Sequence, residues 1–405
     1  MLSEIDKEME KRGFGSILSW GETTHDNPTL LYLVGGNIAR ETLYMKKMDE
    51  KPILIIHPLD LGSAKKTRVR DIRTFEEFGR RALVEKYGQF KGTILFFAKA
   101  LKELGFKGKI GMIGKLEASR ALKLTFELNK KGLHLEGDWR PDLAEKLRET
   151  KDEDEMKKLA ETASLTEKVV TDTMEYLKNC KVSDSRLLNH GETLTTGKVK
   201  AYISQRIAEH GITEPEETIF AVGSEGADPH NSGGSKVPVR TGVPIVFDIF
   251  PKHRSGYWND LTRTYCLGKT PSKVKKCYDD VLEAQTLATD ALEVGKRYHE
   301  LAEGVCEILE KRGHPTYRTH IKAGTAARMN TGFFHGVGHG VGLTIGEPPG
   351  YNSLTQDSVT QGQVVTVEPG VYYPGWGGIR LEDTVAITGR RKIRNFNRLP
   401  KELEA

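Results

Sequence analysis

Five side chains of the kinds that bind divalent metals lie in short apolar segments of the C-terminal half of this 405-residue chain. They are Asp248, Asp260, His339, Glu368 and Glu382. A carboxylate inside a β-branched run is costly to bury unless a cation neutralises it. Four carboxylates and one imidazole are mostly hard oxygen ligands, which suit a pair of divalent ions such as Mn, Co, Fe or Zn better than a closed thiolate zinc site. The sequence therefore predicts a site for divalent metal.

The two Asp residues occur around a turn. Asp248 follows the apolar run 243–247, and Asp260 lies beyond the turn-like residues 252–256. A hairpin would return the second acid beside the first. A lone Asp at a strand end is more often a turn or capping residue than a ligand. Two of them across one hairpin leave the two interpretations equally open.

The two His residues lie in the glycine-rich segment 333–343. Period-two alternation sends His335 and His339 to one face, and the glycines let another backbone or a substrate come close. A phosphate-binding loop is the alternative, but such a loop should open a helix, and residues 344–349 contain two prolines and a glycine. Either His taken singly would more often be structural.

The two Glu residues repeat the arrangement of the Asp pair. Glu368 ends the run that begins at Val364, and Glu382 lies in the alternating run 378–385, with a stretch rich in Tyr, Pro and Gly between them. Alone, each would more often lie on a solvated face. Across a second hairpin they would meet, as the two Asp do.

The elements that must position these residues form two domains. Residues 1–130 alternate helical signals (2–9, 93–102, 117–130) with strand signals (51–57, 109–113), which predicts a small α/β domain with a partly parallel sheet. After Pro141 a charged amphipathic stretch runs from near Leu143 to about Asn179. We place the boundary near residue 145, giving domains 1–145 and 146–405.

The second domain is predicted to be α+β. From Thr195 the order is a helix, strands with the Asp pair, two helices, then strands with the His and Glu residues, which indicates an antiparallel sheet. Residues 157–172 and 275–290 share a pattern at one offset, which suggests duplicated helix-and-hairpin units. The match is weak, because charged amphipathic helices resemble one another by composition.

Composition narrows the class of partner. The 61 basic and 56 acidic residues leave a formal charge of +5, too small to suggest a nucleic-acid or anionic-membrane surface, so we expect a peptide or small amide substrate. Four scattered cysteines fit a reducing compartment. The charged N-terminus lacks an apolar signal segment, and no apolar run is long enough to span a membrane. A cytoplasmic protein is expected.

Residues 195–390 resemble the pita-bread metallopeptidase superfamily of Xaa-Pro aminopeptidase, prolidase, methionine aminopeptidase and creatinase. The resemblance rests on the order of the five ligands, the Thr-Arg-Thr of residues 262–264, and the His-Gly-x-Gly-His-Gly-x-Gly-Leu string of residues 335–343. It implies a pita-bread catalytic domain, a creatinase-type N-terminal domain, two divalent ions and a homodimer.

The resemblance also implies roles for individual residues. Asp248 and Glu368, or their neighbours, would hold one metal each, Asp260 and Glu382 would bridge or complete the pair, and His339 would ligate. Glu368 would take the proton of the attacking water. His230 and His335 would contact the scissile group and Arg380 would partner the acids. Tyr257 and Trp258 would wall the pocket, although strand aromatics are usually core.

Three features depart from the family pattern. Gly346 stands where the family commonly has a His, seven residues after His339. The spacing between Asp248 and Asp260 is one residue longer than usual, and Phe250 replaces a common Gly. A β-bulge could absorb the extra residue and draw His253 toward the pocket. The predicted metal ligands are complete, whereas the residues facing the substrate are altered.

Three functions follow from this pattern. The first is a dinuclear metal hydrolase, an Xaa-Pro aminopeptidase or dipeptidase that removes an N-terminal residue ahead of proline. The second uses the same fold on a non-peptide substrate, as creatinase-like or ectoine-hydrolase-like amide or C–N hydrolases or a sulfonio-propionate lyase do, because fold alone does not choose the substrate. The third, a catalytically dead peptide-binding module, would typically have lost metal ligands.

Overall fold

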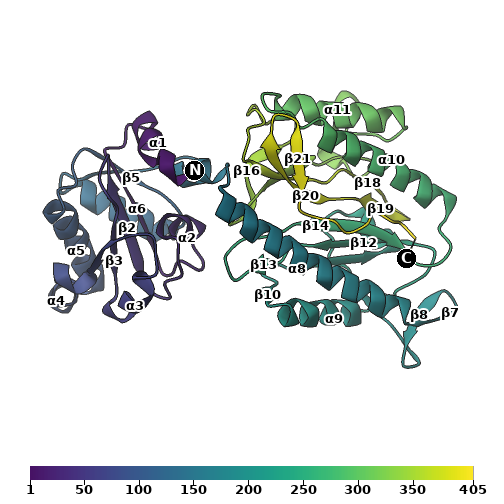
Figure 1. The fold of residues 1–405 in the computed structure, drawn as a ribbon, viewed down its shortest axis with the longest axis horizontal. Helices are drawn as coiled ribbons and strands as arrows, with labels where there is room; N and C mark the ends of the chain where they lie inside the picture. The colour runs from purple at the N-terminus through teal and green to yellow at the C-terminus, as the bar shows by residue number, and fades with distance from the viewer. Residues whose placement is uncertain (405) are drawn as a thin grey trace. The chain divides into compact units, whose positions relative to one another are not determined.

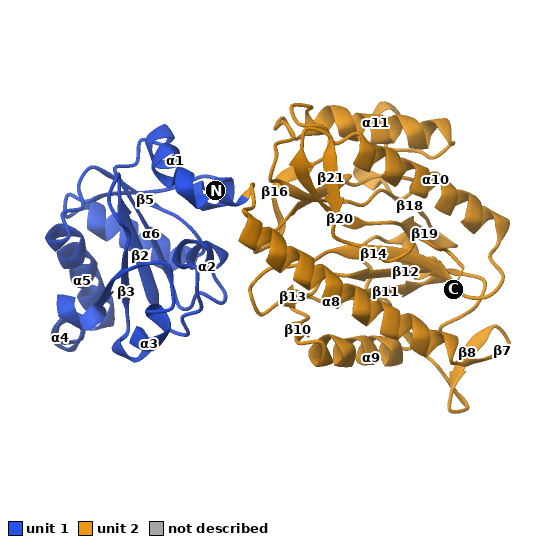
Figure 2. Cartoon of the chain, in the orientation of Figure 1, with its two compact units in different colours: residues 1–148 blue, residues 149–405 orange. Residues whose placement is uncertain are grey.

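The computed structural model describes residues 1–404 and divides the chain into two compact units, residues 1–148 and the remainder from Glu149 (Figures 1 and 2). This division falls three residues beyond the boundary predicted near residue 145. Each unit has its own sheets and its own hydrophobic core, so each is described by itself.

The first unit is a six-stranded sheet with the order β4-β3-β2-β1-β5-β6. Its strands are β1 (Ser16–Gly21), β2 (Thr42–Lys47), β3 (Ile53–Ile56), β4 (Asp71–Thr74), β5 (Lys109–Met112) and β6 (His134–Gly137). The pairs β3–β4, β1–β5 and β5–β6 are parallel, whereas β1–β2 and β2–β3 are antiparallel. The predicted partly parallel sheet is therefore confirmed.

The longer helices of this unit pack on the sheet through apolar stripes. The helices of the unit are α1 (Ile5–Lys11), α2 (Pro28–Val34), α3 (Leu61–Ala64), α4 (Arg80–Tyr87), α5 (Gln89–Glu103), α6 (Ala118–Asn129) and α7 (Leu143–Arg148). Phe97 and Leu101 of α5 and Leu128 of α6 are buried with strand residues such as Ile55. Spacings of three and four residues place such side chains on one helix face, which is why these segments are helical.

The amphipathic stretch predicted from Leu143 to about Asn179 is divided between two helices. α7 ends at Arg148, and α8 (Glu153–Lys178) starts after Asp152. The Asp152 side chain accepts from Glu155 N at 2.9 Å while Glu155 Oε2 accepts from Asp152 N at 2.9 Å. This reciprocal capping box is a helix start signal that the sequence carried.

The second unit repeats one order of elements. Two helices, α8 and α9 (Thr196–Glu209), precede the antiparallel sheet β11-β12-β14, and two more, α10 (Ser272–Asp290) and α11 (Tyr298–Lys311), precede the sheet β16-β15-β17-β20-β21 (Figure 1). The strands of the two sheets are β11 (Ile219–Val222), β12 (Pro244–Ile249), β14 (Leu261–Cys266), β15 (Gly338–Val341), β16 (Ile345–Tyr351), β17 (Val364–Val367), β20 (Asp383–Gly389) and β21 (Lys392–Asn395). The predicted duplication of helix-and-hairpin units matches this order.

Each repeat has its own apolar core. Side chains of α8 and α9 pack against β12 and β14, and side chains of α10 and α11 pack against β17 and β20. The remaining elements are short: β7 (Lys181–Ser183), β8 (Arg186–Asn189), β9 (Glu192–Thr193), β10 (Ile212–Thr213), β13 (Lys252–His253), α12 (Tyr317–Lys322), β18 (Gly370–Tyr373) and β19 (Gly377–Arg380).

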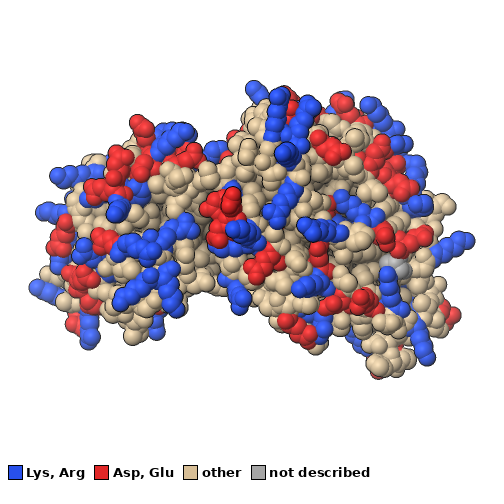
Figure 3. Space-filling view, in the orientation of Figure 1, with Lys and Arg blue, Asp and Glu red and all other residues tan. Residues whose placement is uncertain are grey.

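Acidic and basic side chains are interspersed over the visible face of each unit, as the near-balanced composition predicts (Figure 3). No helix among residues 1–404 is both long and apolar enough to cross a membrane.

Candidate metal centre

All five predicted metal ligands line one pocket of the second unit. The pocket has a volume of about 440 Å³. Its lining residues are Glu216, Ile219, Pro229, His230, Asp248, Phe250, Asp260, His335, Gly336, Gly338, His339, Ile345, Asn352, Glu368, Arg380 and Glu382. The pocket therefore collects side chains from both repeats of the unit.

The predicted Asp hairpin is present. β12 and β14 are antiparallel, with Asp248 opposite Thr262, and Asp260 immediately precedes β14. Asp260 is fixed from the other sheet, because Thr384 Oγ1 donates to Asp260 O at 2.9 Å.

The longer loop between the two Asp residues does not bring His253 to the pocket, so that expectation is wrong. Residues Lys252–His253 form β13, which pairs with β10, and His253 Nδ1 lies 2.9 Å from Ser255 Oγ. His253 is not among the pocket residues. Pairing with β10 absorbs the extra length, and Phe250 is the loop residue that lines the pocket.

The two Glu residues lie where one strand pair gives way to another. β17 pairs with β20 up to Val367 opposite Asp383, and β18 pairs with β19 from Gly370 opposite Arg380. Glu368 and Glu382 stand opposite each other between these pairings. Their backbone N–H groups turn to other strands, since Glu368 N donates to Val337 O at 2.7 Å and Glu382 N to Thr262 O at 3.0 Å. This switch directs both carboxylates into the pocket.

His339 lies on β15, which packs closely against β17. A Cβ on Gly338 would overlap the carbonyl of Thr366, so glycine is needed at that position. His339 Nδ1 lies 3.1 Å from Gly340 O, and because a carbonyl only accepts, Nδ1 carries the proton. The lone pair of Nε2 is left facing the acids.

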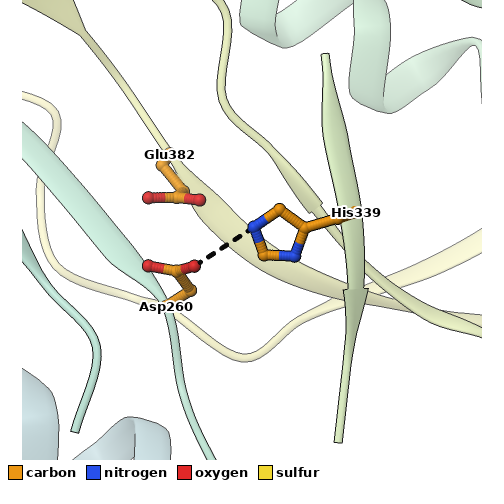
Figure 4. A group of neighbouring side chains, drawn as sticks. All are labelled: Asp260, His339 and Glu382. Atoms are coloured by element: carbon orange, nitrogen blue, oxygen red, sulfur yellow. Dashed lines mark ion pairs between the residues drawn. The ribbon is translucent and has the colours of Figure 1, made fainter. Parts of the chain in front are cut away.

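The atoms closest to one another form a candidate ligand group. One ligand atom each of Asp260, His339 and Glu382 lies within 4.8 Å of the others, and the three side chains point toward one another (Figure 4). His339 Nε2 is 3.5 Å from Asp260 Oδ2 and 3.6 Å from Glu368 Oε1. Glu368 therefore borders this group.

Asp248 is held by Arg380. Arg380 Nη2 donates to Asp248 Oδ2 at 2.5 Å, and Arg380 Nη1 donates to Tyr372 Oη at 2.8 Å. The Tyr372 hydroxyl lies 2.9 Å from His335 Nε2, and His335 Nδ1 lies 2.7 Å from Gly336 O. The proton therefore sits on Nδ1, and Nε2 accepts from Tyr372. Arg380 thus partners an acid, as the resemblance implied, and both ring nitrogens of His335 are engaged.

The acids are poorly compensated by the protein alone. Burial, followed by the charges of neighbouring acids, raises the pKa of Asp260, Glu368 and Glu382 well above the usual range. Burial also lowers the pKa of His339, so its ring is neutral and able to ligate. Asp248 Oδ1 and Glu382 Oε1 are buried without a hydrogen-bond partner among the described residues. Divalent cations fit this donor set, since they would pair the unpartnered oxygens and keep the carboxylates ionised.

Of the other predicted site residues, His230 is exposed in the loop that follows residues Gly223–Ala227, and it lines the pocket. Tyr257 does not, which corrects the expectation that it walls the pocket. Its hydroxyl donates to Glu155 of α8 at 2.8 Å, and Trp258 Nε1 donates to Leu343 O. Tyr257 is therefore held by α8 and Trp258 by the residues that follow β15, and neither lines the pocket.

Five lining residues have no predicted role. They are Glu216, Ile219, Pro229, Ile345 and Asn352. They come from separate loops and strand ends and carry no shared spacing, so nothing in the sequence could have joined them except the nearness of the last two to the His motif.

Comparison with known proteins agrees with this geometry. The profile of metallopeptidase family M24 matches residues 157–389. An Xaa-Pro dipeptidase of Pyrococcus furiosus is 31% identical over 279 residues, 67% of this chain and 75% of the relative. An uncharacterized peptidase of Staphylococcus aureus is 29% identical over 243 residues, and the matched part is 60% of this chain and 61% of that protein.

Solved structures share the whole fold. A prolidase from Pyrococcus horikoshii superposes with a TM-score of 0.75 at 23% identity, covering 99% of both chains. An X-Pro aminopeptidase from Thermotoga maritima gives 0.76 at 21% identity, covering 98% of this chain and 100% of that one.

The fold, the acid-lined pocket and the matched family profile together define a pita-bread metal-dependent hydrolase. The chain belongs to metallopeptidase family M24. The predicted fold class and the prediction of a hydrolase of the metallopeptidase class are confirmed, and membership implies divalent metal ions.

Proposed function

We propose that this protein is an Xaa-Pro peptidase that removes an N-terminal residue ahead of proline with the help of two divalent ions. The observation that carries the proposal is the convergence of Asp260, His339 and Glu382 within 4.8 Å in a pocket that Asp248 and Glu368 also line. The preference for proline is supported by the 31% identity to an Xaa-Pro dipeptidase.

The five residues predicted as ligands would hold the ions. Four carboxylates and one neutral imidazole suit Mn, Co, Fe or Zn. Divalent ions supply Lewis acidity, since they lower the pKa of water and polarise a scissile carbonyl.

Residues of the chain supply the remaining steps. Glu368, with Oε1 3.6 Å from His339 Nε2, can accept a proton from the attacking water and deliver it to the leaving nitrogen. His230, exposed beside the pocket, can donate a hydrogen bond to the oxygen or leaving group where charge develops. His335, predicted to contact the substrate, lines the pocket, and its Nε2 accepts from Tyr372 and so helps to position that hydroxyl.

A second candidate, hydrolysis of a non-peptide amide or C–N bond, is favoured by one observation. Gly346, with φ +69°, is not among the pocket residues. The imidazole that the family commonly carries at this position is therefore absent from the wall of the pocket. The substrate-facing side of the pocket therefore differs from the family pattern.

One panel tests both candidates. The protein is loaded with Mn or Co, its metal content is measured, and Xaa-Pro dipeptides, longer Xaa-Pro peptides, Met peptides and small cyclic amides are assayed. Hydrolysis of Xaa-Pro bonds with two bound equivalents supports the proposal. Hydrolysis of cyclic amides alone would favour the second candidate, and full metal loading without any peptide turnover would refute the peptidase.

A homodimer and a cytoplasmic location complete the proposal, together with a creatinase-type N-terminal domain formed by the first unit. Free Cys180, Cys266, Cys277 and Cys306 are consistent with a reducing compartment. Equilibrium sedimentation of the purified chain would test the dimer.

A further inference from the structure

The pocket contains one Lys or Arg side chain among the described residues, and that side chain is already engaged. Arg380 is 3% exposed, and its three guanidinium nitrogens donate to Asp248, Tyr372, Thr262 and the Pro229 carbonyl at 2.5–3.3 Å. It is therefore committed to the wall of the pocket and is not free to bind a ligand.

This lining is unfavourable for the free carboxylate of a dipeptide. In an Xaa-Pro dipeptide, the carboxylate follows directly on the residue that leaves. Two divalent ions would balance the four ligand carboxylates, but the exposed acid Glu216 would remain and no cation would be free. A carboxylate that loses hydration without gaining an ion pair binds poorly.

Asn352 offers a neutral donor in the same pocket. Its Oδ1 accepts from Leu354 N at 2.9 Å and from Thr355 Oγ1 at 3.2 Å, which fixes the orientation of the amide. The Nδ2 group has no partner among the described residues, and a Cβ on Gly350 would approach it to 2.8 Å, so glycine there leaves room for the amide. An amide N–H suits the carbonyl of a continuing peptide chain.

A second cavity of about 260 Å³ also borders on Asn352. It shares His335, Gly336 and Asn352 with the metal pocket. Its other lining residues, mostly apolar, are Ala302, Tyr317, Phe334, Val337, Ser353 and Leu354. We name this cavity the apolar annex. Leu354 is 85% exposed, which leaves its side chain available to a ligand.

We propose that the pocket takes peptides that continue beyond the proline, with Asn352 donating to a backbone carbonyl of the substrate and the apolar annex holding an apolar side chain downstream. This inference rests on the proposed function and selects the aminopeptidase over the dipeptidase. Because both cavities are lined by Asn352, a chain that continues past this residue would reach the apolar annex, which a dipeptide would leave empty.

Three substrates separate the effect of the dipeptide's carboxylate charge from the effect of contacts with the downstream residue. They are Ala-Pro, Ala-Pro-amide and Ala-Pro-Leu, assayed with the Mn-loaded protein. We expect kcat/KM to rise in that order, by about tenfold for removal of the carboxylate and about tenfold more for the downstream Leu. A faster Ala-Pro than Ala-Pro-Leu would overturn the inference and leave the proposed function standing. No hydrolysis of any of the three would overturn both.

Two variants test the named residues. Asn352→Asp keeps the Oδ1 acceptor for Leu354 N and removes the donor, so it should lower kcat/KM for Ala-Pro-Leu about tenfold with an unchanged melting temperature. Leu354→Ser should weaken Ala-Pro-Leu selectively over Ala-Pro-amide, whereas Val182→Ser, at another exposed apolar position, on β7, should not.

Binding gives a readout independent of turnover. Calorimetry on Glu368→Gln should show tighter binding of Ala-Pro-Leu than of Ala-Pro, and the difference should shrink when Asn352→Asp is added. Equal affinities for the two peptides, or no effect of Asn352→Asp in either assay, would refute the assignment of Asn352.

Discussion

Arg380 Nη2 donates to Asp248 Oδ2 at 2.5 Å, across 132 residues of sequence, and so places the only Lys or Arg side chain of the described pocket against one of its candidate metal ligands. Both side chains are at most 10% exposed. The pair orients Asp248 and leaves its Oδ1 without a hydrogen-bond partner, facing a pocket of like charges.

Replacing this cation should make stability depend on metal. In Arg380→Met the acids lose their compensating charge, so without metal the free energy of unfolding should fall by about 3 kcal/mol. Added Mn should restore much of the loss, because it would neutralise the same carboxylates. Urea unfolding with and without Mn measures both values.

Arg263→Met is the matched control for that experiment. Arg263 is also buried and pairs with Asp383 at 2.8 Å, but it does not line the pocket. Its loss of stability should be insensitive to Mn, and an equal metal dependence in both variants would contradict the role given to Arg380.

Glu368→Gln should abolish turnover, with a fall in kcat of about a thousandfold or more, because the variant has no carboxylate to accept the proton of the attacking water. Steady-state kinetics and metal analysis are to be run together, since loss of a metal ligand lowers the metal content of the protein whereas loss of the base alone does not. Glu192→Gln, at an exposed position on β9, serves as the control. A rate within a few-fold of the unaltered protein would remove Glu368 from the mechanism.

His335 should stay neutral across the physiological range. Burial, helped by the Arg380 charge, lowers the pKa of this ring from 6.5 to about 3. As the pH falls through 6.5, this residue therefore binds a proton in the unfolded chain but not in the folded protein. Its contribution to the free energy of unfolding is fully present above that pH. It should decline by up to about 1.4 kcal/mol per pH unit from this residue as the pH falls toward 3.

Nitrogen-15 NMR of the labelled imidazoles checks this directly. His335 should show the Nδ1–H tautomer and no titration between pH 5 and 8, whereas a midpoint near 6.5 would disprove the buried, Tyr372-bonded state. A Tyr372→Phe variant removes the donor to Nε2, which favours the neutral ring, and should therefore raise the pKa of His335.

A buried ion pair beside the His motif should be costly to break from one side. Lys151 Nζ lies 2.7 Å from Glu347 Oε1, and both side chains are 1% exposed. Lys151→Met should lower the free energy of unfolding by about 3 kcal/mol, because a buried carboxylate loses the cation that it pairs with. Chemical denaturation with a double-mutant cycle tests this.

Adding Glu347→Leu to Lys151→Met should recover about half of the loss, since an apolar pair of similar volume needs no compensating charge. Additive losses in the double variant would show that the two side chains do not act as a pair.

Much of the site could be predicted because its chemistry is local. Residue type and short-range periodicity, which depend on neighbours a few positions away, predict the candidate ligands, the strands that carry them and the duplicated order of helices and sheets. The candidate ligands are Asp248, Asp260, His339, Glu368 and Glu382. The break before α8 was also written there, in the pair Asp152 and Glu155.

Tertiary structure alone decided which side chains reach the pocket and how they are engaged. His253 and Tyr257 lie near the second Asp in sequence yet are held elsewhere by β10 and α8, while Asn352 arrives with no motif of its own. The bonds from Arg380 to Asp248 and from Tyr372 to His335 span 132 and 37 residues. Such contacts depend on the packing of one strand layer on another, and no short-range pattern in the sequence records that packing.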